Sequence, residues 1–439
     1  MINVNKITMK LIKVEIDGYR NVDKASISLS EITTLVSVNS YGKSNLMNAI
    51  GFAAWFISAD SATKKKMMSD ALYVPINKET AGRDFRADFL FQSEDMGTTY
   101  YADYGFSFEW IRNGNSGCRI TGEWLTLTDD RTAQKPNQII LRKPQPFFRT
   151  LKEGMCDNAI NVGDDELVIN RLKQDDSLYY YWLVRELNSF GVQGVYLERH
   201  FDTRRLFLPS GTVLKSENYS FNLNQLDFIP RMVYQLKKEY KGKYDILIDA
   251  FRQLFPNIHS IDVRETEYSP SYLMNMPLDL PFTMKYASYS MFVNDVNLNQ
   301  PINFSVLSDG ARRVFLMLTV AIVADMTGVS LIEIEEPENS IHPALLQSYL
   351  NVLSQFAGNC RILISSHSPY IVQYVNTADI YIGRPNRSGL AQFSRIKNSK
   401  IKELLEDCKQ SDESVGGYIF DLLSGSDDDA ALILGYLEN

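Results

Sequence analysis

The feature that most constrains the fold of this chain is a buried strand that leads through a glycine-containing turn into a helix. Residues 32–38 are typical of a buried strand, and apolar residues follow at helical spacing between Leu46 and Ile57. Residues 37–44, Ser-Val-Asn-Ser-Tyr-Gly-Lys-Ser, lie between them. They match the phosphate-binding loop G-x-x-x-x-G-K-[ST] at every fixed position except the first. Because strands and helices also alternate later in the chain, the sequence predicts an α/β fold with a parallel sheet.

This loop supplies the groups that bind a triphosphate. Asn39, Gly42 and Asn45 belong to the turn and the helix N-terminus, whose N–H groups are expected to surround the β-phosphate. Lys43 is expected to neutralise β- and γ-oxygens, and Ser44 to coordinate Mg²⁺. Ser37 replaces the first glycine, and its Cβ is tolerable only if φ stays below zero. The loop therefore predicts ATP binding and leaves the rate of turnover open.

Two adjacent carboxylates, Glu335 and Glu336, end a buried apolar strand over residues 329–335. Carboxylates against a core strand are costly unless a cation compensates them, and magnesium would do so. In this interpretation Glu335 holds a water on the metal, while Glu336 orients and deprotonates the water that attacks the γ-phosphate. The alternative is a solvated acidic turn after the strand.

Two more segments carry polar groups at the ends of buried elements. His367 follows a buried strand at residues 361–365, where open α/β folds bind ligands, so it is a candidate hydrogen-bond donor to the γ-phosphate. The alternative is a structural histidine.

Ser308 and Gly310 precede an apolar helix at residues 312–326 and offer a hydroxyl and bare amides to an anion. By spacing alone, a plain helix cap with Ser308 or Asp309 as the N-cap residue is the favoured interpretation.

Together these four segments resemble the ABC-type ATPases of the RecF, SMC and OLD group. The closest resemblance is to compact bacterial AAA family ATPases of anti-phage systems. Residues 307–310 resemble the signature sequence, residues 335–343 the Walker B motif and D-loop, residues 366–369 the switch histidine, and residues 16–21 the strand-edge element. The resemblance implies an α/β fold: an ABC-type ATPase head with a mixed sheet, an antiparallel N-terminal subsheet and a helical insertion.

The resemblance also implies a function and partners. It implies hydrolysis of ATP with Mg²⁺ and a homodimer, or a higher even oligomer, in which Ser308 and Gly310 of one subunit contact the phosphate held at Lys43 of the other. Full-length OLD nucleases carry a Toprim domain after the switch histidine, and residues 368–439 are too few for one. A separate effector protein, expected to be a nuclease, is therefore implied, as in two-component defence systems of the Septu or PARIS type.

Two other functions remain open from the sequence. One is a nucleotide-gated scaffold, in which ATP closes the dimer but Ser37 and Glu335 make hydrolysis negligible. The other is a RecF-like DNA-repair ATPase. The formal net charge of −8 argues against binding nucleic acid by bulk attraction, so DNA contact would be local. Residues 64–66, three lysines, are a candidate for such a contact and are otherwise a solvated face.

Composition and boundaries complete the expectations. The longest apolar stretch, residues 314–324, is too short to span a bilayer, and no secretory signal is found, so a cytoplasmic protein without membrane contact is expected.

The predicted domains are an N-terminal ATPase lobe (1–130), a mostly helical insertion (131–300), a C-terminal ATPase lobe (301–385) and an acidic tail (386–439). Apolar positions in the tail favour either a docking helix for the effector or a helix packed on its own domain.

Overall fold

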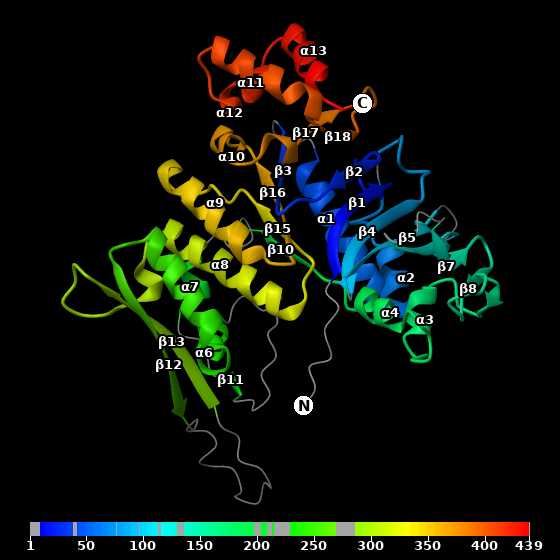
Figure 1. Cartoon of the computed structure of the whole chain (residues 1–439), viewed down its shortest axis with the longest axis horizontal. Helices are drawn as coiled ribbons and strands as arrows, with labels where there is room; N and C mark the ends of the chain where they lie inside the picture. The colour runs from blue at the N-terminus through cyan, green and yellow to red at the C-terminus, as the bar shows by residue number, and fades with distance from the viewer. Residues whose placement is uncertain are drawn as a thin grey trace, which may run out of the picture. The chain divides into compact units, whose positions relative to one another are not determined.

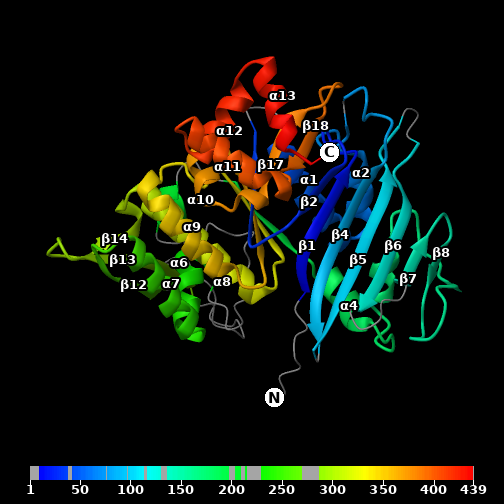
Figure 2. The ribbon, with the colours of Figure 1, turned by 45° about the horizontal axis from the view of Figure 1, so that its top comes forward.

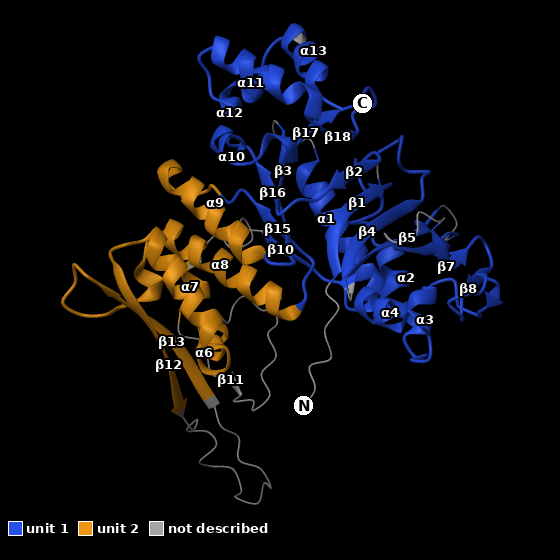
Figure 3. Ribbon diagram, viewed as in Figure 1, with its two compact units in different colours: residues 1–195, 328–337, 358–439 blue, residues 196–327, 338–357 orange. Residues whose placement is uncertain are grey.

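The computed structural model forms two compact units. It describes residues 9–37, 42–75, 77–95, 97–112, 116–129, 136–196, 203–208, 213–214, 229–268 and 286–438. Unit 1 comprises residues 1–195, 328–337 and 358–439, and unit 2 comprises residues 196–327 and 338–357 (Figure 3). The units differ from the expected domains, because residues 136–159 continue the N-terminal sheet and residues 338–357 belong with the inserted region.

Unit 1 contains an eight-stranded antiparallel sheet in the order β2-β1-β4-β5-β6-β7-β8-β9 (Figure 2). Its strands are β1 Met9–Asp17, β2 Ala25–Ser28, β4 Phe85–Asp95, β5 Thr98–Glu109, β6 Arg119–Asp129, β7 Asn137–Arg142, β8 Pro146–Phe148 and β9 Asn158–Ala159. Apolar and polar residues alternate along β1 and β5, so one face is buried. This confirms the predicted antiparallel subsheet and extends it beyond residue 130.

Aromatic side chains fill the space between this sheet and helix α1, Lys43–Ser58. The Phe56 ring centroid lies 5.0 Å from that of Phe106 and 4.8 Å from that of Phe108. Phe52 packs edge-on against Phe85 at 5.3 Å. These contacts hold α1, and with it the end of the phosphate-binding loop, on the rigid sheet. Helices α2 Ser61–Ser69, α3 Val168–Leu172 and α4 Tyr181–Asn188 also belong to unit 1.

A second sheet of unit 1 has the strand order β10-β15-β16-β3-β17-β18 (Figure 1). Its strands are β3 Ile32–Val36, β10 Val192–Tyr196, β15 Leu331–Glu335, β16 Arg361–Ser366, β17 Ile380–Pro385 and β18 Ala391–Arg395. The pairs β15/β16, β16/β3 and β3/β17 are parallel, and β17/β18 is antiparallel. Ser365 is in register with both Glu335 and Leu35. The mixed α/β sheet confirms the predicted fold class and brings three motif-bearing strand ends to one edge.

The acidic tail folds into helices that pack on unit 1. After α10 Pro369–Tyr374 these are α11 Ile401–Gln410, α12 Val415–Ser424 and α13 Asp427–Tyr436. Ile419 and Leu422 of α12 share a core with Val372 and Ile380. The apolar positions of the tail therefore serve its own domain, as one of the two interpretations of the sequence expected.

Unit 2 combines helices with a small antiparallel sheet. Its helices are α5 Thr203–Leu206, α6 Ile229–Glu239, α7 Lys241–Leu254, α8 Asp309–Thr327 and α9 Pro343–Ala357, and its strands are β11 Val213–Leu214, β12 Ile258–Tyr268, β13 Tyr286–Asp295 and β14 Ile302–Asn303. Phe315 of α8 packs against Phe304 at 4.7 Å and Phe251 at 5.1 Å between ring centroids. The insertion is thus less helical than expected. In the described parts of the chain, no helix combines the length and apolarity needed to cross a bilayer.

Candidate functional site

The described end of the phosphate-binding loop is Gly42, the N-cap of α1, with φ 85°. Glycine is needed here because this backbone region disfavours other residues. A Cβ at position 42 would also lie 2.4 Å from the Cβ of Ala391, too close for any side chain. The fixed turn places Lys43 at the start of the helix. Asn39 lies among residues 38–41, outside the described residues, so its predicted role stays a prediction.

Lys43 is 6% exposed and its ammonium is held by groups of the chain. Its Nζ donates to the Ser37 hydroxyl oxygen at 2.8 Å and to the Ser37 carbonyl at 3.2 Å. It also lies 2.9 Å from Nε2 of His367. The first and third predicted segments therefore meet in space, although they are far apart in the sequence. Ser37 keeps a φ outside the left-handed region, which satisfies the condition for a residue other than glycine there.

His367 is positioned by a sharp transition from strand to helix. The Ser366 hydroxyl at the end of β16 accepts from the Ser368 N–H at 2.9 Å, and the Ser368 hydroxyl caps α10 by accepting from the Tyr370 N–H at 3.3 Å. Burial, followed by the nearby Lys43 ammonium, lowers the pKa of His367 below its usual value. The ring is thus neutral near pH 7, and one of its nitrogens is free of a proton and can accept from Lys43.

Glu336 completes this cluster from the next strand. Its Oε1 lies 3.8 Å from His367 Nε2, and its side chain is 31% exposed. The backbone has φ 47°, and its N–H donates to the Ser365 carbonyl at 2.8 Å. A left-handed conformation is strained for a glutamate and turns its side chain away from the strand direction. Lys43, His367 and Glu336 therefore converge at the carboxyl edge of the parallel strands, where α/β folds bind ligands.

The predicted metal ligands have suitable chemistry. Ser44 follows Lys43 in the first turn of α1 and is exposed, while Glu335 is the last residue of β15, in register with Ser365. A hydroxyl and a carboxylate are oxygen ligands, which Mg²⁺ prefers, and two protein ligands leave its other positions for phosphate and water. The residues present thus fit magnesium in donor type.

The strand-edge element contributes residues that the sequence did not single out as site residues. Arg20 has φ 48°, and its Nη1 donates to the Asn45 side-chain oxygen at 2.9 Å. The Asn45 amide in turn donates to the Asn21 side-chain oxygen at 2.7 Å. Arg20 therefore places a guanidinium beside the first turn of α1, next to Lys43 and Ser44. The resemblance of residues 16–21 to the strand-edge element is the sequence feature that points to Arg20.

The signature residues belong to unit 2. The Ser308 hydroxyl accepts from the Ala311 N–H at 3.3 Å, as a helix cap does. Gly310 packs backbone to backbone on the D-loop, since a Cβ there would lie 2.2 Å from the Ser340 carbonyl oxygen. Arg313 Nε donates to Asp309 at 2.7 Å and fixes the same turn. This hydrogen bond is the one that the capping interpretation expects, and the Ser308 hydroxyl is exposed, so its O–H can donate to an anion.

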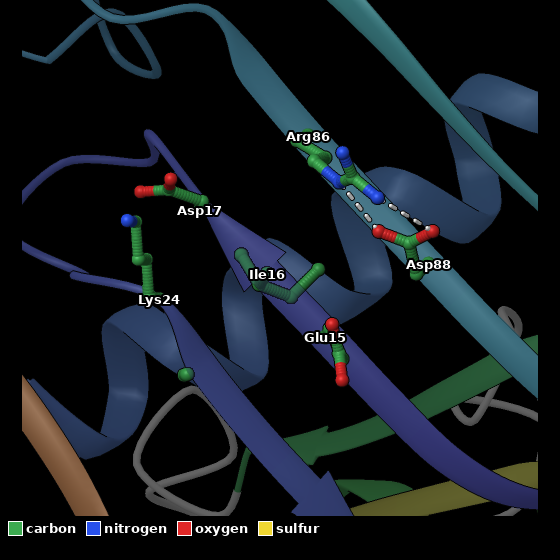
Figure 4. Close-up of a pocket in the computed structure, with 7 residues that line it drawn as sticks. Glu15, Ile16, Asp17, Lys24, Arg86 and Asp88 are labelled. Carbon is green, nitrogen blue, oxygen red and sulfur yellow. Dashed lines mark hydrogen bonds and ion pairs between the residues drawn. The ribbon is translucent and has the colours of Figure 1, made fainter.

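A cavity of about 290 Å³ lies elsewhere, on the polar face of the antiparallel sheet (Figure 4). It is lined by side chains of β1, β4 and the strand β2 region. The Arg86 guanidinium donates to the Asp88 carboxylate at 2.7 Å and lies 4.4 Å from the Trp124 ring centroid. Ile16 and Asp17 of the strand-edge element line it, but Lys43, Glu336 and His367 do not, so the cavity is separate from the cluster at Lys43.

Comparisons with known proteins agree with this geometry. Residues 195–373 match a family described as "AAA domain, putative AbiEii toxin, Type IV TA system", and residues 9–111 match one described as "Protein of unknown function (DUF2813)". No curated protein matches the chain. Among solved structures, the SMC head bound to the C-terminal winged-helix domain of ScpA has a TM-score of 0.50 at 11% identity, covering 90% of this chain and 99% of that one.

An SMC head domain from Thermotoga maritima, with a TM-score of 0.41 at 10% identity, covers 88% of this chain and 99% of that one. The similarity to the first SMC head and the order of the strands both concern the fold. The AAA match concerns residues 195–373. The chain thus has a mixed α/β fold similar to that of an SMC head, and residues 195–373 match an AAA domain.

Proposed function

We propose that this protein binds and hydrolyses ATP, dimerises around the nucleotide and controls a separate effector protein. The observation that carries the ATPase proposal is the convergence of Lys43, His367 and Glu336 at one sheet edge. A buried lysine to bind phosphate oxygens and a carboxylate to orient and deprotonate water are recurring parts of phosphoryl transfer from ATP, and a neutral histidine beside them can donate a hydrogen bond to a phosphate. The similarity to ATPase heads supports the same conclusion.

Each residue has a task that its surroundings permit. Lys43 places a positive charge against β- and γ-oxygens, and the amides at the start of α1 donate to the same phosphates. Glu336 accepts the proton of the attacking water, which its partly exposed carboxylate can reach. His367, neutral because its pKa is lowered, keeps one N–H to donate to a γ-phosphate oxygen. Magnesium, held by Ser44 and Glu335, would supply further charge neutralisation.

Dimerisation is proposed from the signature. Ser308 and Gly310 present a hydroxyl and a bare backbone at the N-terminus of α8, an anion-binding arrangement. In the proposed homodimer this turn contacts the γ-phosphate held by Lys43 of the partner. The SMC head with which the chain shares its fold was solved bound to a domain of another protein, which is in line with an effector that binds separately.

A defence role is proposed from the family match. The description of the family that matches residues 195–373 refers to the AbiEii toxin and to a type IV toxin–antitoxin system. We infer that the effector is a toxic protein, a nuclease in the simplest case, which the nucleotide state restrains or releases. Purification of the native complex followed by mass spectrometry tests this inference. Recovery of the chain without a stoichiometric partner under such conditions would contradict it.

Replacement of Glu336, the proposed catalytic base, tests the ATPase activity. We expect Glu336→Gln to lower phosphate release by about 10²- to 10⁴-fold, because the amide cannot accept a proton, while ATP binding persists. Lys43→Ala should instead weaken binding itself. Glu79→Gln makes the same chemical change at an exposed position and serves as the matched control. Phosphate release that is equal in wild type and Glu336→Gln would favour the nucleotide-gated scaffold.

A further inference from the structure

Ser37 stands where the phosphate-binding loop has its first glycine, and its side chain is fully buried. It follows β3 directly, so the sheet fixes its backbone. Both of its oxygens accept from Lys43 Nζ, the hydroxyl at 2.8 Å and the carbonyl at 3.2 Å. A glycine at this position would offer the carbonyl alone. The hydroxyl is thus an additional acceptor for the lysine, specific to serine.

A glycine on the neighbouring strand makes room for this side chain. β17 pairs in parallel with β3, Ile382 opposite Val36, so Gly383 lies beside Ser37. A Cβ at position 383 would lie 3.3 Å from the Ser37 Cβ and 2.8 Å from the Phe393 ring. Both distances are tight for carbon atoms. The small residue that the loop lacks is therefore present on β17, and the serine fits without displacing the sheet.

Three donors on the lysine find three acceptors in this arrangement. An ammonium has three N–H groups, and Lys43 meets the two oxygens of Ser37 and Nε2 of His367 at 2.9 Å. These are the N–H groups that a phosphate would need. In the protein without nucleotide, Ser37 thus occupies part of the coordination that β- and γ-oxygens would fill.

We propose that Ser37 is a positioning residue: its hydroxyl holds the Lys43 ammonium beside His367 in the nucleotide-free protein, and a triphosphate must replace this bond to engage the lysine. The first half, the hold of Ser37 on Lys43, is argued from the geometry of unit 1 alone. The second half, the replacement of this bond by a triphosphate, rests on the proposed ATP-binding function. The consequence is a weaker affinity for ATP than a glycine would give, in exchange for a lysine that stays fixed without ligand.

The first half is tested on the full chain without nucleotide by NMR titration of His367. Burial is the largest cause of the lowered pKa of this histidine and the fixed ammonium is the next, while Glu336 and a hydrogen bond to the Ser37 backbone, which Ser37→Ala retains, act in the opposite direction. In Ser37→Ala the lysine loses one of its three acceptors and is held less firmly beside His367, so the pKa of His367 should rise. Ser37→Cys, with a weakly accepting sulfur, should give an intermediate value. His367→Gln identifies the resonance among the four histidines of the chain.

Thr34→Val is the matched control on the same strand. Thr34 is also fully buried in β3, and its hydroxyl has no hydrogen-bond partner among the described residues. Its removal should leave the pKa of His367 unchanged. An unchanged pKa in Ser37→Ala, with the variant folded by circular dichroism, would overturn the proposal. A shift of the same size in Thr34→Val would do so too, because it would reveal a general effect of strand β3.

Nucleotide affinity tests the second half, with a fluorescent ATP analogue and Mg²⁺. Ser37→Ala should bind about tenfold more tightly than wild type, the size expected from one hydrogen bond to a charged group. Equal or weaker binding overturns this half. If neither protein binds nucleotide while the pKa of His367 shifts as expected, the hold on Lys43 stands and the proposed ATP-binding function fails. The two ideas are therefore separable.

Discussion

At the scale of single residues, Lys64 illustrates how burial changes the meaning of a charge. Residues 64–66 read as a solvated or DNA-contacting face, but Lys64 is only 1% exposed. Its Nζ donates to the Asn170 side-chain oxygen at 2.9 Å and lies 5.6 Å from the Phe56 ring centroid. Burial lowers its pKa to about 8. Lys64 is therefore a core residue, which leaves Lys65 and Lys66 as the exposed members of the triplet.

Glu123 is the acidic counterpart inside unit 1. It is fully buried, and its carboxylate accepts from the Val168 N–H at 2.6 Å, the Ile169 N–H at 3.0 Å and the Tyr104 hydroxyl at 3.2 Å. Burial outweighs these hydrogen bonds and raises its pKa to about 7. No sequence pattern marks this buried carboxylate, since Glu123 lies within an otherwise ordinary strand pattern.

A pH dependence of stability follows from Glu123. Its pKa is about 7 in the fold against an ordinary value of 4.5, so the folded protein binds the proton more tightly. Its stabilising contribution is complete below about pH 4.5 and is lost as the pH rises through about 7. The loss should be on the order of 2–3 kcal/mol. Chemical denaturation at pH 5 and pH 8 measures it, and Glu123→Gln, which cannot titrate, should show a smaller change. An equal pH dependence in both proteins would contradict this account.

At the scale of elements, the sequence predicted the strands and helices whose own residues form a clear hydrophobic pattern. The strands at residues 32–36, 331–335 and 361–366 agree with the prediction, because each is an apolar run bounded by polar or turn residues, and so does helix α1. The β12/β13 pair was missed, since its two strands are joined through a long segment rather than a tight turn. Helices α6 and α7 follow each other along the chain and are separated at Tyr240.

Helix α12 packs closely against the start of α10. A Cβ at Gly416 would lie 1.9 Å from the Pro369 carbonyl oxygen, two residues after His367. We expect Gly416→Ala to destabilise the C-terminal helices by about 1–3 kcal/mol, because backbone atoms cannot yield as side chains do. Gly417→Ala is the control, as its new Cβ would meet only the flexible Ser414 hydroxyl at 3.3 Å. Hydrogen exchange of α11 to α13 measures both, and equal protection in the two variants would refute the prediction.

At the scale of the whole molecule, the units cut across the expected domains. Residues 137–142 were assigned to the insertion, yet β7 pairs with β6 and belongs to unit 1. Such pairing depends on contacts between distant segments, which a local pattern does not encode. The same limit applied to the site. The motifs identified Lys43, Glu336 and His367, but the strand order was needed to bring Gly383 beside Ser37.

The proposed dimer predicts complementation between two inactive variants. Lys43→Ala disables the phosphate-binding loop, and Ser308→Arg should block the signature turn. If each site combines Lys43 of one subunit with Ser308 of the other, a mixed dimer has one site with both parts intact. Mixing the purified variants should then restore up to about a quarter of wild-type phosphate release, as half of the dimers are mixed and each has one of two sites. Absence of any restored activity in subunits shown to exchange would contradict a shared site.

The contact between Gly310 and Ser340 has a consequence for any mutational scan of this protein. Because a Cβ at position 310 would lie 2.2 Å from a backbone oxygen, every substitution there should lower the amount of folded protein, whether or not a ligand is ever bound. The exposed Ser308 should tolerate most replacements by the same measure of abundance. Substitutions at position 308 should therefore impair function without lowering the amount of folded protein. Substitutions at position 310 should impair both.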